Sequence, residues 1–314
     1  MKTEGQYQTI RNQLGVSATV GALVELLGNL FQSSDLYYGH GTDNPHDEAF
    51  ALVFSVIGLD FGEADRFWDQ QVAPDHIDTI ADLASKRISQ RVPLPYLTGE
   101  AWFAGLRFYS DRRALIPRSP FAELIQQEFS PWLESRHDIK ILDMCTGNGC
   151  IGIACAVYMP DAKVDLVDLS PEALELAQNN VELHEVGDRV NVICSDLFEA
   201  LQGRQYDLIV SNPPYVPASS MVDLPVEYRH EPEMALLAEN EGLSVVDRIL
   251  RQAADYLTHE GILIVEVGEI ADAVHHHYPA LPFIWLEFEY GGEGVFLLHK
   301  SDLMDWRHGK SKDS

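Results

Sequence analysis

The fold of this chain is decided by an apolar run that leads straight into a glycine-rich loop. The stretch reads Ile139-Lys140-Ile141-Leu142-Asp143-Met144-Cys145-Thr146-Gly147-Asn148-Gly149-Cys150-Ile151-Gly152. Its first four residues predict a strand, and residues 151–158 predict the helix that follows the loop. Gly147 and Gly149 would let the backbone approach a ligand closely, and Gly152 would allow tight packing of helix on strand. This order of elements is typical of a site for a nucleotide-like cofactor.

The chain from about residue 121 onward alternates between helical and strand patterns. Apolar runs predict seven strands, at residues 139–142, 163–167, 190–194, 207–210, 261–267, 285–288 and 294–299. Helices are predicted at residues 121–129, 151–158, 171–182 and 243–256. This alternation predicts an α/β fold with a doubly wound, Rossmann-like sheet of seven strands. Gly291 and Gly292, between the last two strands, predict an antiparallel terminal hairpin.

The first part of the chain follows a different pattern. Residues 1–92 carry apolar positions at helical spacing and predict a small N-terminal helical domain for substrate recognition. Pro93 and Pro95 break this spacing and place a boundary there. We expect a hairpin arm and linker at residues 93–120, the cofactor-binding domain at 121–300 and a polar tail at 301–314.

Composition narrows the classes of partner. The 314 residues include 49 acidic and 22 basic side chains, which give a net charge of −27. Such a surface repels the phosphate backbones of nucleic acids and attracts a basic partner. The alternative explanation is that the acidic residues only keep the protein soluble. The start of the chain has no signal-peptide core, and no run of eighteen apolar residues occurs, so we expect a cytoplasmic protein without membrane association.

Metal ligation is not expected. The four cysteines lack the close paired spacing of a zinc site, and we expect them to be reduced. The run His275–His277 lies in a predicted surface helix without paired carboxylate ligands. The four cysteines are Cys145, Cys150, Cys155 and Cys194.

A second motif stands directly behind the strand predicted at 207–210. It reads Asn212-Pro213-Pro214-Tyr215. An amide nitrogen is a poor nucleophile, because its lone pair is delocalised into the carbonyl group. The Asn212 side-chain oxygen and the Pro213 carbonyl would accept hydrogen bonds from both N–H groups of such a nitrogen and aim its lone pair. The two prolines stiffen the turn, and Tyr215 would offer an aromatic face.

Residues at the strand ends complete the predicted cofactor site. Asp168 would accept hydrogen bonds from two ribose hydroxyls. Asp196 would accept one from the amino group of an adenine ring, and Leu169 and Leu197 would flank that ring. Asp143 suits a cofactor with a free amino acid end, reached directly or through water. For S-adenosylmethionine, with S-adenosylhomocysteine as product, the predicted binding residues are Asp143, Thr146, Gly147, Asn148, Gly149, Asp168, Leu169, Asp196, Leu197 and Asn212.

A nicotinamide dehydrogenase is the rival interpretation, because Gly147, Gly149 and Gly152 also satisfy the dinucleotide fingerprint. A pyrophosphate would be repelled by Asp143, and the turn at 212–215 has no role in hydride transfer. The two motifs together predict methyl transfer from S-adenosylmethionine to an amide or amino nitrogen. The predicted catalytic residues are Asn212, Pro213, Pro214 and Tyr215.

On these motifs the chain resembles the protein glutamine N(5)-methyltransferases over nearly its whole length. The turn at 212–215 is shared with adenine amino-methyltransferases of DNA. One branch of the family modifies peptide release factors, and the other modifies the large-subunit ribosomal protein numbered three. Four segments resemble the ribosomal branch: Tyr96–Gly105, Ile116–Pro120, Leu142–Gly147 and Leu224–Glu233.

The resemblance implies that Asn212 and Pro213 hold the substrate glutamine amide and that the adenosylmethionine lies over Gly147–Gly149. It also implies a basic ribosomal protein as substrate, which fits the net charge of −27. Asn148 stands where the family often has serine. Three alternatives stay open: methylation of a release factor, methylation of DNA adenine, and a non-catalytic binding module with the same fold.

Overall fold

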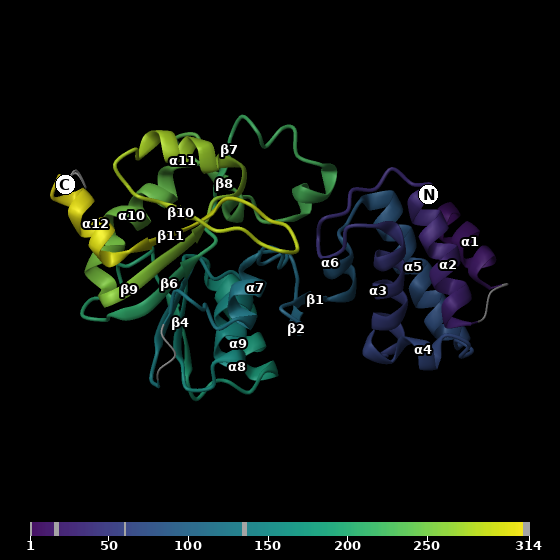
Figure 1. Ribbon diagram of the computed structural model, residues 1–314. Coiled ribbons are helices and arrows are strands. Elements are labelled where there is room, and N and C mark those ends of the chain that lie inside the picture. The colour runs from purple at the N-terminus through teal and green to yellow at the C-terminus, as the bar shows by residue number, and fades with distance from the viewer. Residues whose placement is uncertain (1, 16–18, 60, 134–136, 310–314) are drawn as a thin grey trace. The chain divides into compact units, whose positions relative to one another are not determined.

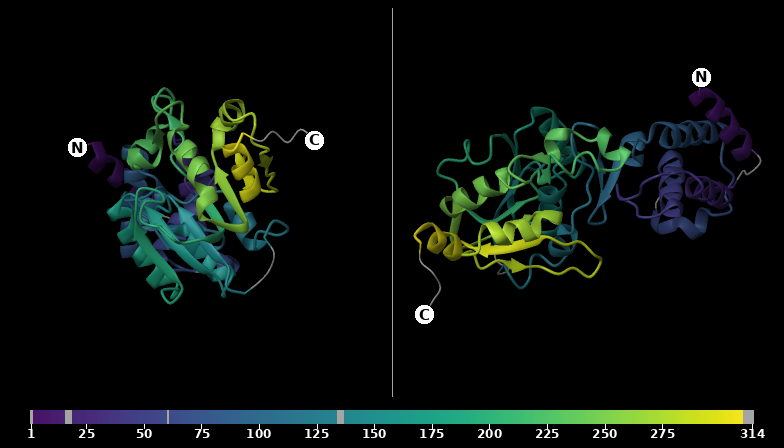
Figure 2. Two further views of the ribbon diagram at one scale, coloured as in Figure 1. Left: turned by 90° about the vertical axis from the view of Figure 1, so that its left-hand side faces the viewer. Right: turned by 90° about the horizontal axis from the view of Figure 1, so that it is seen from above.

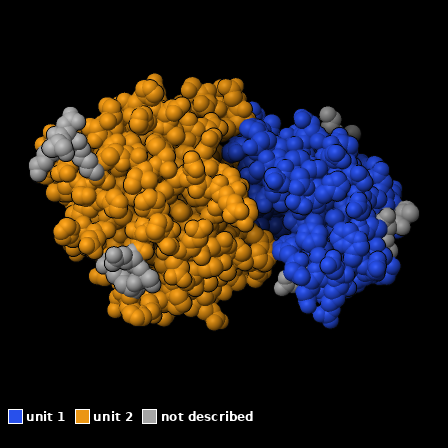
Figure 3. Space-filling view, viewed as in Figure 1, with its two compact units in different colours: residues 1–101, 110–112, 225–230 blue, residues 102–109, 113–224, 231–314 orange. Residues whose placement is uncertain are grey.

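The computed structural model describes residues 2–15, 19–59, 61–133 and 137–309, which divide into two compact units (Figures 1 and 3). One unit is mainly helical and comprises Met1–Ala101, Ser110–Arg112 and Pro225–His230. The other contains the sheet and comprises Trp102–Tyr109, Arg113–Leu224 and Glu231–Ser314. The sequence patterns placed the boundary at residue 92 and did not assign residues 225–230 to the helical unit. The last five residues of the expected polar tail lie outside the described part of the chain.

The helical unit is built around α2, α3 and α5, whose apolar faces form its core. Leu23, Leu27 and Leu52 are fully buried there. The side chain of Thr19 caps α2, and that of Asn44 caps α3, by accepting backbone N–H groups of the first turn. The helices are α1 (Lys2–Leu14), α2 (Val20–Gln32), α3 (Pro45–Ile57), α4 (Ala64–Phe67), α5 (Pro74–Gln90) and α6 (Leu94–Thr98), with 3₁₀ turns η1 (Phe61–Glu63) and η2 (Val226–His230).

The second unit contains a seven-stranded sheet with the order β10-β11-β9-β6-β3-β4-β5. The five strands from β9 to β5 in that order run parallel, and β11 pairs antiparallel with both β9 and β10. The predicted doubly wound α/β sheet with its antiparallel terminal hairpin is therefore confirmed. The strands are β3 (Lys140–Met144), β4 (Lys163–Asp168), β5 (Val190–Cys194), β6 (Tyr206–Ser211), β9 (Leu257–Glu266), β10 (Ile284–Trp285) and β11 (Val295–His299).

Helices cover both faces of this sheet (Figure 2). On one face α7 (Phe121–Gln126), α8 (Cys150–Tyr158) and α9 (Pro171–Leu183) pack against the strands. On the other face the cover is α10 (Ser244–Tyr256), α11 (Ala271–His277) and α12 (Lys300–Arg307). The central strand β6 is buried along its whole length. Such double cover leaves the carboxyl ends of the parallel strands as the natural place for a ligand.

Short elements complete the two units. A hairpin is formed by β1 (Glu100–Phe103) and β2 (Leu106–Tyr109), and β7 (Val216–Pro217) pairs with β8 (Leu237–Ala238). Two further 3₁₀ turns are η3 (Glu233–Ala235) and η4 (Gly268–Ile270). The expected polar tail begins with the packed helix α12, in which Leu303 is fully buried. Within the described ranges, no helix combines the length and apolarity needed to cross a membrane.

Candidate active site

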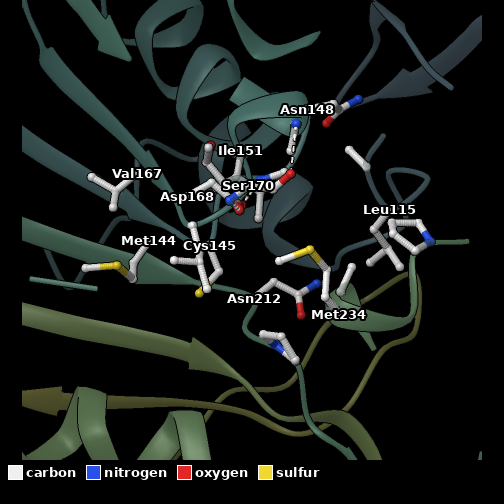
Figure 4. A pocket seen from close by; sticks show the side chains of 18 of the residues that line it. Leu115, Met144, Cys145, Asn148, Ile151, Val167, Asp168, Ser170, Asn212 and Met234 are labelled. Carbon is white, nitrogen blue, oxygen red and sulfur yellow. Dashed lines mark hydrogen bonds between the residues drawn. The ribbon is translucent and has the colours of Figure 1, made fainter. Parts of the chain in front are cut away.

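A pocket of about 280 Å³ lies at the carboxyl ends of four neighbouring parallel strands, β3 to β6 (Figure 4). Loops that follow these strands bring together most of the predicted site residues. Asp143, Gly149, Pro213 and Tyr215 are not in its lining. Those that line it are Thr146, Gly147, Asn148, Asp168, Leu169, Asp196, Leu197, Asn212 and Pro214.

The glycine loop has the backbone conformation that its composition predicts. Gly147 and Gly149 have φ angles of 57° and 86°, in the left-handed region that favours glycine. A Cβ added at Gly152 would lie 2.2 Å from the Leu166 side chain of β4, so α8 can approach the sheet only with glycine here. The expectation of tight helix-to-strand packing at Gly152 is confirmed.

The buried side chain of Asp143 is hydrogen-bonded to both sides of this loop. Its Oδ2 accepts hydrogen bonds from the Thr146 hydroxyl at 2.5 Å and from the Gly152 N–H at 2.8 Å. Its Oδ1 is buried and has no hydrogen-bond partner within the described residues. Burial raises the pKa of Asp143 to about 7, against the two hydrogen bonds, which lower it. The carboxylate therefore orders the loop with one oxygen and leaves the other available to a donor.

Asp168 stands at the end of β4 and lines the pocket. Its Oδ2 accepts from the Gly147 N–H at 2.8 Å, and its Oδ1 from the Ser170 N–H at 2.9 Å. Burial raises the pKa of Asp168, and these backbone hydrogen bonds oppose the rise. The Leu169 N–H is a third backbone donor to this carboxylate. Because a carboxylate offers about four acceptor positions, one remains for a ligand hydroxyl.

Asp196 has a partner that the sequence patterns did not indicate. Its carboxylate pairs at 2.9 Å with Arg248 of α10, and both residues line the pocket. Leu169 is 57% exposed, whereas Leu197 is buried, and both also line the pocket. The two leucines and the acid thus lie together as expected, with an arginine added.

The Asn-Pro-Pro-Tyr turn follows β6 directly. Asn212 and Pro214 face the pocket, and Figure 4 shows Asn212 on a different side of it from Asp168. Ser211 anchors the turn by donating its hydroxyl to the Met144 carbonyl at 2.7 Å. The Tyr215 ring packs against Gly268 instead of lining the pocket, and a Cβ added at Gly268 would lie within 3.0 Å of it.

Two segments that are distant in sequence, residues 113–119 and residues 232–237, line the rest of the pocket. Arg118 makes a bidentate ion pair with the buried Glu231, at 2.5 and 2.7 Å. Leu115 from the first segment and Met234 from the second line the cavity. Spacing could not have identified these residues, because they lie more than one hundred positions apart; the resemblance of both segments to one family was the available signal.

No group of three histidine, cysteine or acidic side chains suited to a metal ion occurs in the ranges that the structure describes. His275, His276 and His277 are exposed on α11.

Comparisons with known proteins show the family to which the chain belongs. Residues 127–225 match the methyltransferase small domain. The ribosomal protein uL3 glutamine methyltransferase of Francisella tularensis subsp. tularensis is 43% identical over 281 residues, which cover 89% of this chain and 90% of that protein. The chain belongs to this family.

A second relative carries the same name. The ribosomal protein uL3 glutamine methyltransferase of Xanthomonas campestris pv. campestris is 44% identical over 287 residues, which cover 91% of this chain and 92% of that protein. Among solved structures, a methyltransferase from Pyrococcus furiosus aligns with a TM-score of 0.46 at 17% identity, over 62% of this chain and 89% of that one. The two relatives and the methyltransferase small domain show that the chain is an enzyme of the methyltransferase class.

Proposed function

We propose that this protein transfers a methyl group from S-adenosylmethionine to the side-chain nitrogen of a glutamine in ribosomal protein uL3. The observation that carries the proposal is the position of Asn212 in one pocket with Asp168 and Gly147. A hydrogen-bonding turn for a planar amide and a cradle for a nucleoside face the same cavity. The family of the chain supports the same substrate.

The residues present fit the cofactor. The unpartnered Oδ1 of Asp143 suits the ammonium group of an amino acid, directly or through water. Asp168 keeps an acceptor position for a ribose hydroxyl. Asp196 lies with Leu169 and Leu197, where an adenine ring would be flanked. S-adenosylmethionine, when bound, supplies an electrophilic methyl group on a sulfonium centre.

The turn residues act on the substrate nitrogen. The Asn212 oxygen and the Pro213 carbonyl would accept its two N–H groups, which favours a tetrahedral nitrogen with its lone pair directed at the methyl group. The side chains need not supply a strong base, because an N-methylated amide cation loses its proton readily. Catalysis then rests on positioning and on preorganised polar groups.

A competition assay tests the substrate. We expect unmethylated uL3 and a release factor, supplied in equal amounts with labelled S-adenosylmethionine, to give label almost entirely on one glutamine of uL3. Peptide mass spectrometry locates the label. Preferential labelling of the release factor would contradict the ribosomal substrate and leave the chemistry intact, whereas a methylated adenine in added DNA would contradict the substrate class.

Salt dependence provides a second readout of the same assay. The net charge of −27 should speed encounter with a basic protein, and exposed charges are screened beyond a Debye length of about 10 Å at 0.1 M salt. The rate on uL3 should therefore fall as salt rises. A rate that is independent of salt would remove electrostatic steering from the proposal.

Asp168→Ala should weaken S-adenosylmethionine binding by about 1–3 kcal/mol, because the ligand loses a charged acceptor. Titration calorimetry measures the change. The matched control is Glu172→Ala, which removes an exposed acid four residues later in α9 and should leave the affinity unchanged. Wild-type affinity in a folded Asp168→Ala variant would exclude this carboxylate from the cofactor site.

A further inference from the structure

The carboxylate of Glu266 lies beside the catalytic turn, although it is not among the described residues that line the pocket. Glu266 ends β9, and the parallel pairing of β9 with β6 sets Val265 opposite Ser211. Asn212 and Glu266 each follow by one residue, so the register of the sheet brings them to the same edge. Glu266 is only 6% exposed.

Three donors converge on this buried carboxylate. The Ser119 hydroxyl donates to Oε2 at 2.5 Å, and the Tyr215 hydroxyl lies 3.5 Å from Oε1. The side chain of Asn212 is a third hydrogen-bond partner. Arg118, in the segment before α7, adds a nearby positive charge. The sheet and two loops thus surround Glu266 with donors, as an ionised carboxylate requires.

An asparagine side chain presents an NH₂ donor on one side and an oxygen acceptor on the other. An ionised carboxylate only accepts hydrogen bonds, so it pairs with the NH₂ group. We propose that Glu266 is a positioning residue which, by holding the Asn212 NH₂ group, turns the Asn212 oxygen toward the substrate nitrogen. This inference rests on the proposed function, because it assigns Asn212 that task.

The ionisation of Glu266 gives the inference a pH signature. Burial raises the pKa of Glu266 to about 7, and the hydrogen bonds and Arg118 limit the rise. The other ionisable groups near Glu266 do not change charge near pH 7. Burial raises the pKa of the Cys150 thiol well above its usual value, and arginine and tyrosine side chains ordinarily titrate at about pH 10 or above. A protonated Glu266 can donate to the Asn212 oxygen and turn the amide the wrong way. Turnover should therefore rise with pH through about 7.

Glu266→Gln tests the role, because a glutamine offers both a donor and an acceptor and no longer dictates the amide orientation. We expect kcat at pH 8.5 to fall roughly 10- to 100-fold, as for a misplaced reacting group, while the Kd for S-adenosylmethionine stays within about twofold. The rise of kcat near pH 7 should disappear. The matched control is Glu269→Gln, the same change at an exposed position three residues later, which should keep the wild-type profile.

The pH profile also separates Glu266 from Asp143, the other buried carboxylate with a pKa of about 7. If the limb near pH 7 persists in Glu266→Gln, the inference is wrong. It is equally wrong if cofactor affinity falls as much as kcat, since that indicates general damage to the fold. Ser119→Ala gives an independent reading: loss of a donor to the ionised form should move the limb to higher pH.

A double-mutant cycle asks whether Glu266 acts through Asn212. In the Asn212→Ala background, Glu266→Gln should cause no further loss of turnover, because the group that it orients is already gone. Multiplied losses in the double variant would overturn the inference. Wild-type enzyme that fails to methylate uL3 would instead contradict the proposed function, so the two failures are distinguishable.

Discussion

Asn212→Ala is expected to lower turnover by about two to three orders of magnitude while S-adenosylmethionine remains bound. In the proposed mechanism the substrate amide loses the acceptor that holds its nitrogen in the reactive geometry. Removal of one preorganised polar contact typically has an effect of this size. Asn212 lies after β6, across the pocket from Asp168, so cofactor contacts should persist. Single-turnover methylation of uL3 measures the chemical step, and calorimetry measures cofactor binding.

The control for this variant is Asn179→Ala, which removes an exposed asparagine from α9 and should have wild-type turnover. Asn212→Asp keeps an acceptor but adds charge beside the substrate, and it should fall between the two. Near-normal turnover in Asn212→Ala would mean that another group orients the nitrogen. Loss of cofactor binding in parallel would mean that a contact of Asn212 with the cofactor, and not with the substrate amide, accounts for the lower turnover.

The sheet could be predicted from the sequence because each of its strands is a local apolar run. β5 has the predicted bounds, and the central strands differ by one or two residues at their ends. Since parallel strands end at the same edge, residues behind successive strands meet, which is why Gly147, Asp168 and Asn212 could be grouped from spacing alone.

Local patterns failed where structure depends on distant partners. β9 begins at Leu257, four residues before the predicted start, because polar residues after Leu257 do not form an apolar run. The Leu257 carbonyl accepts a hydrogen bond from the Lys300 side chain. Lys300 begins α12, and the sequence pattern predicts a polar tail directly after it. Arg248 was missed for the same reason: its partner Asp196 lies fifty-two positions earlier.

The least predictable feature is a cluster of buried charges within the helical unit. Arg87, 1% exposed, pairs with Glu48 at 2.5 Å and with Glu227 at 3.0 Å. Arg91 also donates to Glu227, at 2.7 and 3.1 Å. Burial alone would raise the pKa of Glu227, but hydrogen bonds from Arg91, from the Tyr37 N–H and from Arg87 lower it to about 2. This cluster holds residues 225–230 in the helical unit, although they follow the turn at 212–215 in sequence.

Glu227→Ala is expected to destabilise the helical unit by about 3–5 kcal/mol, because it leaves two guanidinium groups without their shared carboxylate. Hydrogen exchange should then show lower protection of α3 and α5 amides, while the strands of the sheet keep theirs. The matched control is Glu25→Ala, which removes an exposed acid from α2 of the same unit and should change protection little.

The size of that effect does not mean that the ion pairs make the unit stable. Taking the charges of Glu48, Arg87 and Glu227 out of water costs much of what their attraction returns. An apolar cluster of similar volume would therefore stabilise the unit about as well. Each buried charge is tolerated only while its oppositely charged partner is present, so the loss of one side chain leaves the others buried without a partner. Arg87→Met combined with Glu48→Leu should therefore be less destabilising than Arg87→Met alone, which leaves Glu48 buried without its cation. If the double variant is the less stable of the two by hydrogen exchange, the cluster contributes net stability and this account of it is wrong.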